Sequence, residues 1–172
     1  MYGPQMSISG PVTYAVEAKV RVDLPPDAGL RDLASHFHFT KLEPGFGAVR
    51  VAAGPGRSVV IHLNGTVLAS AGSADDAIFL CDRVAERLSP NSPPGAPTVV
   101  NVFASASLPG PLRLEALSKR LGAVYDRNGC KAARLRTGEV TLQLYGSGRV
   151  LMRAPRGGLF EEAFTSLQTR CR

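Results

Sequence analysis

The clearest pattern near the start of the chain is a strict alternation of apolar and charged residues. Val16, Ala18, Val20 and Val22 alternate with Glu, Lys, Arg and Asp, and this period of two is typical of a strand with one buried face. After a proline-rich turn the apolar residues change to helical spacing, which predicts a short amphipathic helix. Its apolar positions are Leu30, Leu33, Ala34 and Phe37.

Short apolar runs separated by glycine-containing turns follow this helix. Gly54-Pro55-Gly56 and Asn64-Gly65 separate the runs, and Asn-Gly between β-type residues is the strongest short signal for a β-hairpin. A longer helix closes the segment. Ser73 is a suitable N-cap for it, and one apolar face follows at Ile78, Cys81, Val84, Ala85 and Leu88.

The same order of elements occurs twice in the chain. Residues 16–37 align with residues 100–121 at an offset of 84, so that Leu24-Pro25 meets Leu108-Pro109. Residues 57–70 align with residues 140–153 at an offset of 83. The identity between the two segments is low, but the order and spacing of their elements match, which indicates a duplicated module. The second closing helix has its apolar face at Leu159, Phe160, Ala163, Phe164 and Leu167.

We therefore predict an α+β fold of two tandem repeats, residues 14–88 and 99–171. A stiff proline-rich linker at 89–98 joins them, and residues 1–13 are expected to form a flexible N-terminus. Pairing of the two first strands about a pseudo-twofold axis would give a saddle, with a curved antiparallel sheet and four helices on its convex face. The other face of such a sheet must meet solvent or a ligand.

Charge is distributed unevenly along the chain. Residues 1–89 hold eight Lys/Arg and nine Asp/Glu, whereas residues 90–172 hold twelve Lys/Arg and five Asp/Glu. A basic half favours polyanions such as nucleic acid, because binding to phosphates releases counterions. Solubility alone is the other explanation for this excess of positive charge.

Few features indicate covalent chemistry or a cofactor. The cysteines, Cys81, Cys130 and Cys171, are too few and too far apart for a disulfide framework or a zinc site. His36 and His38 have the spacing of two ligands on one strand face, but no motif places a third. No phosphate-binding loop or nucleophile elbow is present. We therefore expect no enzyme, metal or small-molecule cofactor.

The N-terminus lacks the pattern of a secretion signal, and no apolar run approaches about 18 residues. We expect an intracellular protein with reduced cysteines that is neither secreted nor associated with a membrane.

The duplicated order of strand, helix, antiparallel meander and long helix resembles the TATA-box-binding protein (TBP) family. The segment VVNVFASASLPGPLRLEAL at 99–117 is similar to the opening strand and helix of the family's repeat. NGTV at 64–67 and GSGRV at 146–150 resemble its glycine turns, and EPGFGAV at 43–49 resembles a loop that carries a wedge phenylalanine. The resemblance extends over residues 14–171.

The resemblance implies which residues contact DNA. Four phenylalanine wedges of the family fall here on Phe46, His62, Cys130 and Tyr145, so that only one is unchanged. The family's strand asparagine, which faces minor-groove acceptors, falls on Asn101 in the second repeat and on Glu17 in the first. A carboxylate cannot donate to those acceptors, whereas an amide can. The basic positions of the family fall on Arg136, Arg149 and Arg156, and Phe103, on the same strand as Asn101, is also expected to contact DNA.

These assignments lead to two hypotheses of different classes. In the first, the protein is a divergent TBP-like initiation factor that binds and bends duplex DNA through the minor groove, at an A/T-rich or divergent promoter element, together with other initiation factors. It would then work in the nucleus of a eukaryote or in the cytoplasm of a prokaryote. In the second, the same fold is a protein-interaction scaffold that has lost TATA-box binding. A third possibility, an accessory domain of a nucleic-acid enzyme, has no accompanying catalytic domain to support it.

Overall fold

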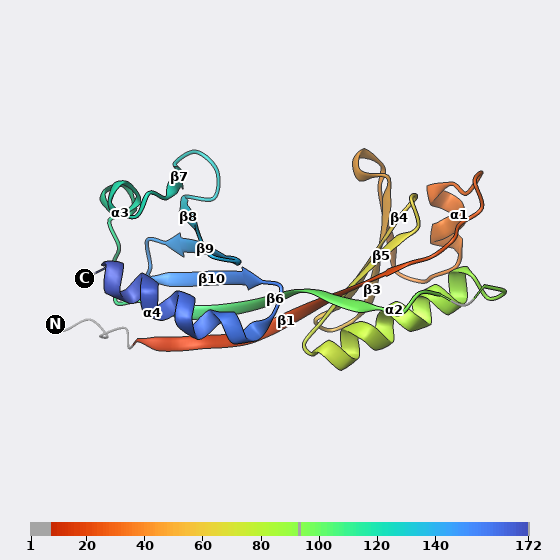
Figure 1. The fold of residues 1–172 in the computed structure, drawn as a ribbon. Coiled ribbons are helices and arrows are strands. Elements are labelled where there is room, and N and C mark those ends of the chain that lie inside the picture. Colours follow the sequence, from red (N-terminus) through yellow and green to blue (C-terminus); the bar gives the residue numbers. More distant parts are fainter. Residues whose placement is uncertain (1–7, 93, 172) are drawn as a thin grey trace. The chain divides into compact units, whose positions relative to one another are not determined.

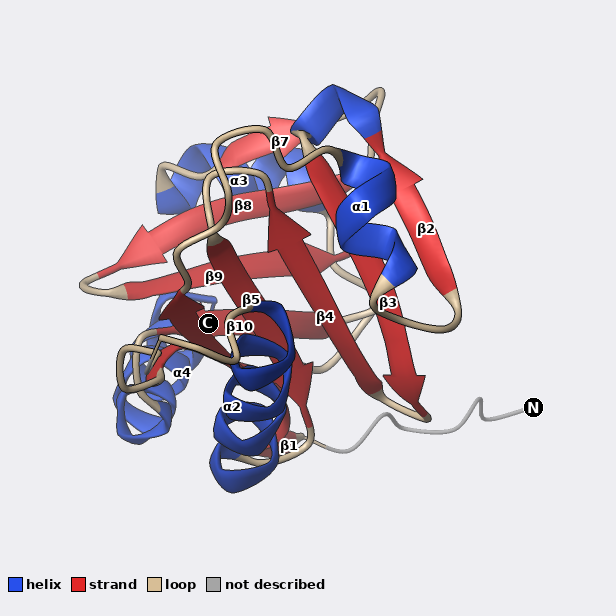
Figure 2. Ribbon diagram, turned by 90° about the vertical axis from the view of Figure 1, so that its right-hand side faces the viewer, coloured by secondary structure: helices blue, strands red, loops and turns tan. Residues whose placement is uncertain are grey.

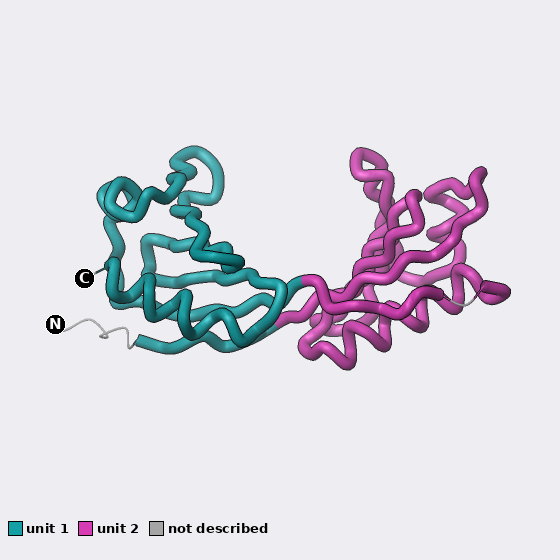
Figure 3. Tube along the Cα trace, in the orientation of Figure 1, with its two compact units in different colours: residues 1–14, 101–172 teal, residues 15–100 magenta. Residues whose placement is uncertain are grey.

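The computed structural model describes residues 8–92 and 94–171 and divides the chain into two compact units (Figure 3). Unit 2 is residues 15–100, and unit 1 combines residues 1–14 with residues 101–172. The two predicted repeats therefore correspond to the two units except at their first strands, because β1 (Ser9–Arg21) and β6 (Thr98–Ser107) each contribute residues to both units.

Each unit contains an antiparallel sheet and two α-helices, so the predicted α+β class is confirmed (Figures 1 and 2). In unit 2 the strand order is β2-β3-β4-β5-β1, and in unit 1 it is β6-β10-β9-β8-β7. Besides β1, unit 2 contains α1 (Leu30–Ser35), β2 (Thr40–Glu43), a 3-10 turn η1 (Pro44–Phe46), β3 (Ala48–Gly54), β4 (Arg57–His62), β5 (Thr66–Ala71) and α2 (Ala74–Leu88). Besides β6, unit 1 contains α3 (Leu114–Leu121), β7 (Val124–Asp126), β8 (Ala132–Thr137), β9 (Val140–Tyr145), β10 (Arg149–Ala154), η2 (Gly157–Leu159) and α4 (Phe160–Cys171).

Two predicted boundaries need correction. Of the expected flexible N-terminus at 1–13, residues 1–7 lie outside the described residues, whereas Ser9 to Thr13 already belong to β1. The predicted linker at 89–98 ends one residue too late, because Thr98 is the first residue of β6. No helix in the described part of the chain is long and apolar enough to span a membrane.

Alternation along the strands gives each sheet one buried and one open face. In β1, Ala18 and Val20 are buried, while Lys19 and Arg21, which alternate with them, are exposed. The buried strand residues of unit 2 pack with the apolar side of its helices, including Leu33 of α1 and Cys81 of α2. Unit 1 repeats this pattern, and four of the five predicted face residues of its last helix are buried, namely Phe160, Ala163, Phe164 and Leu167. Leu159 lies before the helix, in η2, and is only partly buried.

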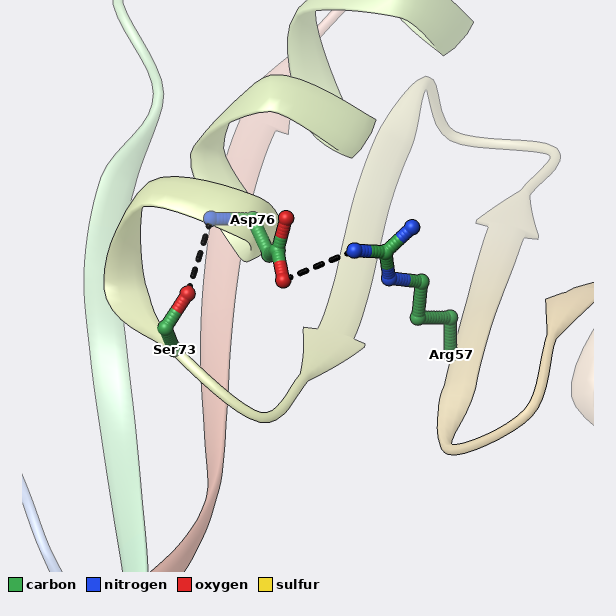
Figure 4. A network of polar contacts seen from close by, with 3 residues as sticks. All are labelled: Arg57, Ser73 and Asp76. Carbon is green, nitrogen blue, oxygen red and sulfur yellow. Dashed lines mark hydrogen bonds and ion pairs between the residues drawn. The ribbon is translucent and has the colours of Figure 1, made fainter.

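The N-terminus of α2 is anchored to the sheet by a small polar network (Figure 4). The Ser73 side chain accepts a hydrogen bond from the Asp76 amide at 3.2 Å, which confirms the predicted N-cap. The Asp76 carboxylate in turn accepts a hydrogen bond from the Arg57 guanidinium at 2.9 Å. Because Arg57 begins β4, these contacts connect the first turn of the helix to the sheet that it covers.

Equivalent hydrogen bonds in the two units give the correspondence of their first strands. The Val22 amide donates to the Gly65 carbonyl at 2.9 Å, and the Leu108 amide donates to the Gly148 carbonyl at 2.8 Å. Leu108 therefore corresponds to Val22 and not to Leu24, so the sequence alignment of the first strands is wrong by two residues.

The correction changes which residues are equivalent near the middle of these strands. Val16 pairs with Ala71 and Val102 pairs with Ala154, at matching positions of β5 and β10. The counterpart of Asn101 in the first repeat is therefore Ala15, and Glu17 corresponds to Phe103. The helices keep the predicted alignment, because α1 begins at Leu30 and α3 at Leu114. The loop between first strand and first helix is thus two residues shorter in unit 1.

Candidate nucleic-acid interface

The open face of the sheet in unit 1 carries four exposed arginines, on the two strands that flank β9. Arg134 and Arg136 lie on β8, and Arg149 and Arg153 lie on β10. The register places them in rows: Arg136 and Arg153 both pair with Thr141 of β9. The ion pairs found among the described residues involve other arginines. These guanidinium groups therefore form a positive surface suited to phosphates.

Two of these arginines are positioned by hydrogen bonds. Arg153 Nε donates to Asn101 Oδ1 at 2.8 Å, so the predicted minor-groove amide uses its oxygen to hold a neighbouring cation. Arg136 Nε donates to the carbonyl of Gly138 in the adjacent hairpin turn at 3.0 Å. Each of these contacts restrains a guanidinium at the sheet surface, which lowers the entropy cost of placing it against an anion.

The predicted wedge positions of unit 1 lie within a polar network. Cys130 is exposed, and its sulfur accepts hydrogen bonds from Arg134 at 3.5 Å and Gln143 at 3.4 Å. The Gln143 amide also donates to the Tyr145 hydroxyl at 2.9 Å. Asp126 holds the loop, because the amides of Gly129 (2.7 Å) and Cys130 (3.2 Å) donate to its carboxylate. These hydrogen bonds, the one from Gly129 above all, lower the pKa of Asp126 below its ordinary value.

Phe46 is the exposed apolar side chain at the corresponding position of unit 2. It ends η1, where Pro44 starts the turn and Gly47, with a φ of 56°, stops it in the left-handed conformation. The Leu63 amide donates to the Gly47 carbonyl at 2.9 Å, which fixes this turn to the end of β4. The Phe46 side chain is 79% exposed. A rigid turn therefore presents an aromatic ring to solvent.

The remaining predicted site residues are placed less uniformly. His62 is half-buried at the end of β4 and pairs with Ala48, on the open face of unit 2. Arg149 begins β10 on the open face and pairs with Ser107. Arg156 lies beyond the end of β10, before η2, and forms an exposed ion pair with Glu139 at 3.8 Å. Of the three predicted phosphate contacts, two thus lie on the sheet face.

The open face of unit 2 is also charged. The comparison with the basic positions of the TBP family did not reveal this charge. Lys41 of β2 pairs with Arg50 of β3, and Lys19 and Arg21 extend from β1. Glu43 accepts a hydrogen bond from Arg50 at 3.0 Å, and this bond lowers the pKa of the Glu43 carboxyl. Unit 2 therefore mixes both signs of charge on its open face, whereas the arginine-rich face belongs to unit 1.

A shallow depression lies within the open face of unit 1. Its volume is about 310 Å³, and none of the described residues that line it is acidic. The rings of Tyr14 and Phe103 meet there with centroids 6.4 Å apart and planes tilted by 41°. Tyr14 and Gln143 were missed by the sequence analysis, because only the arrangement of the four strands β1, β6, β10 and β9 side by side brings them near Phe103. The residues that line the depression are Tyr14, Phe103, Arg134, Thr141, Gln143, Leu151, Met152 and Arg153.

These features define a class of protein: a duplicated α+β module whose sheets keep one face free of helices and carry basic and aromatic side chains on it. Among solved structures, TBP of Methanococcus jannaschii is similar over 94% of this chain and 98% of that chain, with a TM-score of 0.68 and 17% identity. The chain therefore has the TBP fold, and the low identity is consistent with a divergent sequence.

A second solved structure, the heterotetrameric sarcosine oxidase from Corynebacterium sp. U-96 in complex with pyrrole 2-carboxylate, aligns over 94% of this chain and 81% of that chain. Its TM-score is 0.46 and its identity 16%. No family model and no curated protein sequence matches the chain.

Proposed function

We propose that this protein binds duplex DNA non-covalently through the open sheet faces of its units, bends it, and acts as a transcription initiation factor. The observation that carries this proposal is the set of four arginines on the open face of unit 1, Arg134, Arg136, Arg149 and Arg153. The TBP fold supports the same assignment. A sheet face of this kind suits the minor groove, where base edges offer few distinguishing contacts and shape dominates recognition.

In this proposal the two units have different roles. The arginines of unit 1 neutralise phosphates and hold the duplex in register. Phe46 of unit 2 inserts between base pairs and kinks the duplex, since its ring is exposed on a rigid turn. For minor-groove binders of this class, unstacking costs about a few kcal/mol per step and is offset by the larger contact area of bent DNA.

The salt dependence of binding tests the phosphate contacts. If the four arginines each neutralise one phosphate, the logarithm of the affinity for a short A·T-rich duplex falls with the logarithm of salt concentration at a slope of about −3.6. Arg136→Gln then reduces the magnitude of the slope by about 0.9 and weakens binding to all DNA sequences by a similar factor. Arg83→Gln is the matched control, because Arg83 is an exposed arginine of α2, on the helix side of unit 2. Equal slopes for the two variants would contradict the assignment.

Bending is tested separately with Phe46→Ala. Because Phe46 is 79% exposed, the variant should keep the stability of the parent protein. Energy transfer between dyes at the ends of a duplex should report loss of the bend, while affinity at low salt is partly retained. A duplex that is bent equally by both proteins would refute the role of Phe46 as a wedge.

A second function, that of a protein-interaction scaffold, is favoured by the network in unit 1. Cys130 is too small to separate bases, and the Tyr145 hydroxyl is hydrogen-bonded to Gln143. A face that has lost its wedges can still bind an acidic protein surface through its arginines. The absence of measurable duplex binding at low salt would support this alternative over the proposed one.

A further inference from the structure

The depression of about 310 Å³ in the open face of unit 1 has a shape and chemistry that phosphate binding alone does not require. Its volume lies at the lower end of the range for small-ligand sites, about 300–1,000 Å³. An arginine-rich surface that only holds a duplex backbone needs neither a recess nor an aromatic wall.

The aromatic part of the depression suits a base. Tyr14 is half-exposed and Phe103 is partly exposed, and the two rings are tilted by 41°. Rings that are not stacked on each other keep their faces available to a third planar group. Bases stack on such side chains regardless of sequence, because every base has a π-face.

The polar part of the depression suits the sugar-phosphate backbone and the base edge. Arg153 is directly opposite Phe103 in the β6–β10 register, and Arg134 is directly opposite Gln143 in the β8–β9 register. Asn101 restrains Arg153, and the sulfur of Cys130 contacts Arg134. Two positioned guanidinium groups thus flank an aromatic wall. The N–H groups of the Gln143 amide beside them donate to Cys130 and Tyr145, and its oxygen is an acceptor for a base edge.

We propose that this depression binds one unpaired nucleotide, with its base stacked on Phe103 and its phosphate held by Arg134 and Arg153. A paired base inside a duplex stacks on its neighbours through both faces, so away from the step that Phe46 opens only an unpaired base can offer a face to Phe103. The inference rests on the proposed function, because it requires this face to meet nucleic acid. It adds that DNA with an unpaired or extruded base is preferred over fully paired DNA.

The experiment compares three labelled probes by fluorescence anisotropy: oligo(dT), an A·T-rich duplex, and the same duplex with one extra unpaired thymine at its centre. Phe103→Leu keeps apolar volume and removes the ring. It should weaken binding of oligo(dT) and the bulged duplex by roughly 5- to 150-fold, the range expected for loss of one stacked base. The paired duplex should be weakened by a clearly smaller factor, because leucine keeps apolar contact at the sheet face and only the unpaired base loses a stacking partner. Phe103→Tyr should restore binding, because tyrosine keeps the ring.

The control is Phe79→Leu, the same substitution at an exposed phenylalanine of α2; it should leave all three probes unchanged. Arg153→Gln tests the site independently and should lower the salt slope for oligo(dT) by about 0.7. Equal weakening of all three probes by Phe103→Leu would overturn the inference and leave the proposed function in place. Absence of binding to any probe by the parent protein would overturn both.

Discussion

Replacement of Gly65 by alanine should destabilise unit 2 much more than a substitution at another glycine of the same sheet. Gly65 has a φ of 83°, and a Cβ added there would collide with the Val22 carbonyl oxygen. The left-handed conformation costs a non-glycine residue about 1–2 kcal/mol. Moving the end of β1 away would weaken the hydrogen bond from the Val22 amide to the Gly65 carbonyl, worth about 0.5–1.5 kcal/mol. It would also expose part of Val22, which is only 4% exposed.

A smaller term opposes this loss, because alanine restricts the unfolded chain more than glycine and so stabilises by about 0.4–1 kcal/mol. The net expectation for Gly65→Ala is a loss of about 0.5–3 kcal/mol in the free energy of unfolding, increased further by the partial exposure of Val22. Gly56→Ala is the matched control. Gly56 also has a positive φ, 67°, but nothing lies within 4 Å of an added Cβ, so its cost should be about 1 kcal/mol.

The same comparison can be repeated in unit 1 with Gly148 and Gly138. Gly148 has a φ of 90° and its Cβ would collide with the Leu108 carbonyl oxygen, whereas Gly138 has a φ of 58° and open space. Urea unfolding followed by circular dichroism gives the midpoint and the m-value for each variant. If the two alanine variants of a unit have the same urea midpoint at equal m-values, the close approach of strand and turn does not account for the expected loss of stability.

The remaining predictions concern α2, the cysteines and the Asp126 loop. Ser73→Ala should lower the free energy of unfolding by about 1 kcal/mol in urea titrations, since it removes the N-cap bond; a loss below about 0.3 kcal/mol would contradict this role. With Ellman's reagent, exposed Cys130 should react first, and fully buried Cys81 should react only after unfolding. Burial raises the pKa of Cys81 from 9.0 to about 11, so its contribution to stability is complete below pH 9 and is lost as the pH rises towards 11; Cys81→Ala should flatten the pH dependence of stability in this range. The pKa of Asp126 is depressed, so its bonds to the loop persist above its ordinary pKa of 3.8 and are lost as the pH falls below that value; amide exchange at Gly129, measured by NMR and corrected for its intrinsic pH dependence, should accelerate at low pH, and Asp126→Asn should show the faster rate already at pH 7.

The local elements could be predicted because each depends on neighbouring residues. The alternation around Ala18 and Val20 fixes which side of β1 is buried, and the helical spacing that includes Cys81 fixes the buried side of α2. Ser73 and the Asn64-Gly65 turn mark a helix start and a hairpin by their own chemistry.

The candidate site could be predicted only in part. The resemblance to the TBP family indicated Phe46, Arg136 and Arg149 as contact residues, and all three are exposed. Tyr14 and Gln143 were not predicted, because they lie on different strands, β1 and β9. Their proximity to Phe103 depends on β1 lying beside β6 and on the register of β9 with β10 and of β10 with β6, which no local pattern encodes.

The sequence by itself determined the duplication, the elements of each repeat and the face of each strand that is buried. The tertiary structure decided the correspondence of the two first strands, where the alignment was wrong by two residues because the following loop differs in length. An error of two residues leaves every side chain on its predicted face, since the side-chain period of a strand is two. It still exchanges the neighbours of each residue, so that Phe103, and not Asn101, is the counterpart of Glu17 and lies opposite Arg153. Faces follow from local periodicity, whereas neighbours across a sheet follow only from long-range pairing.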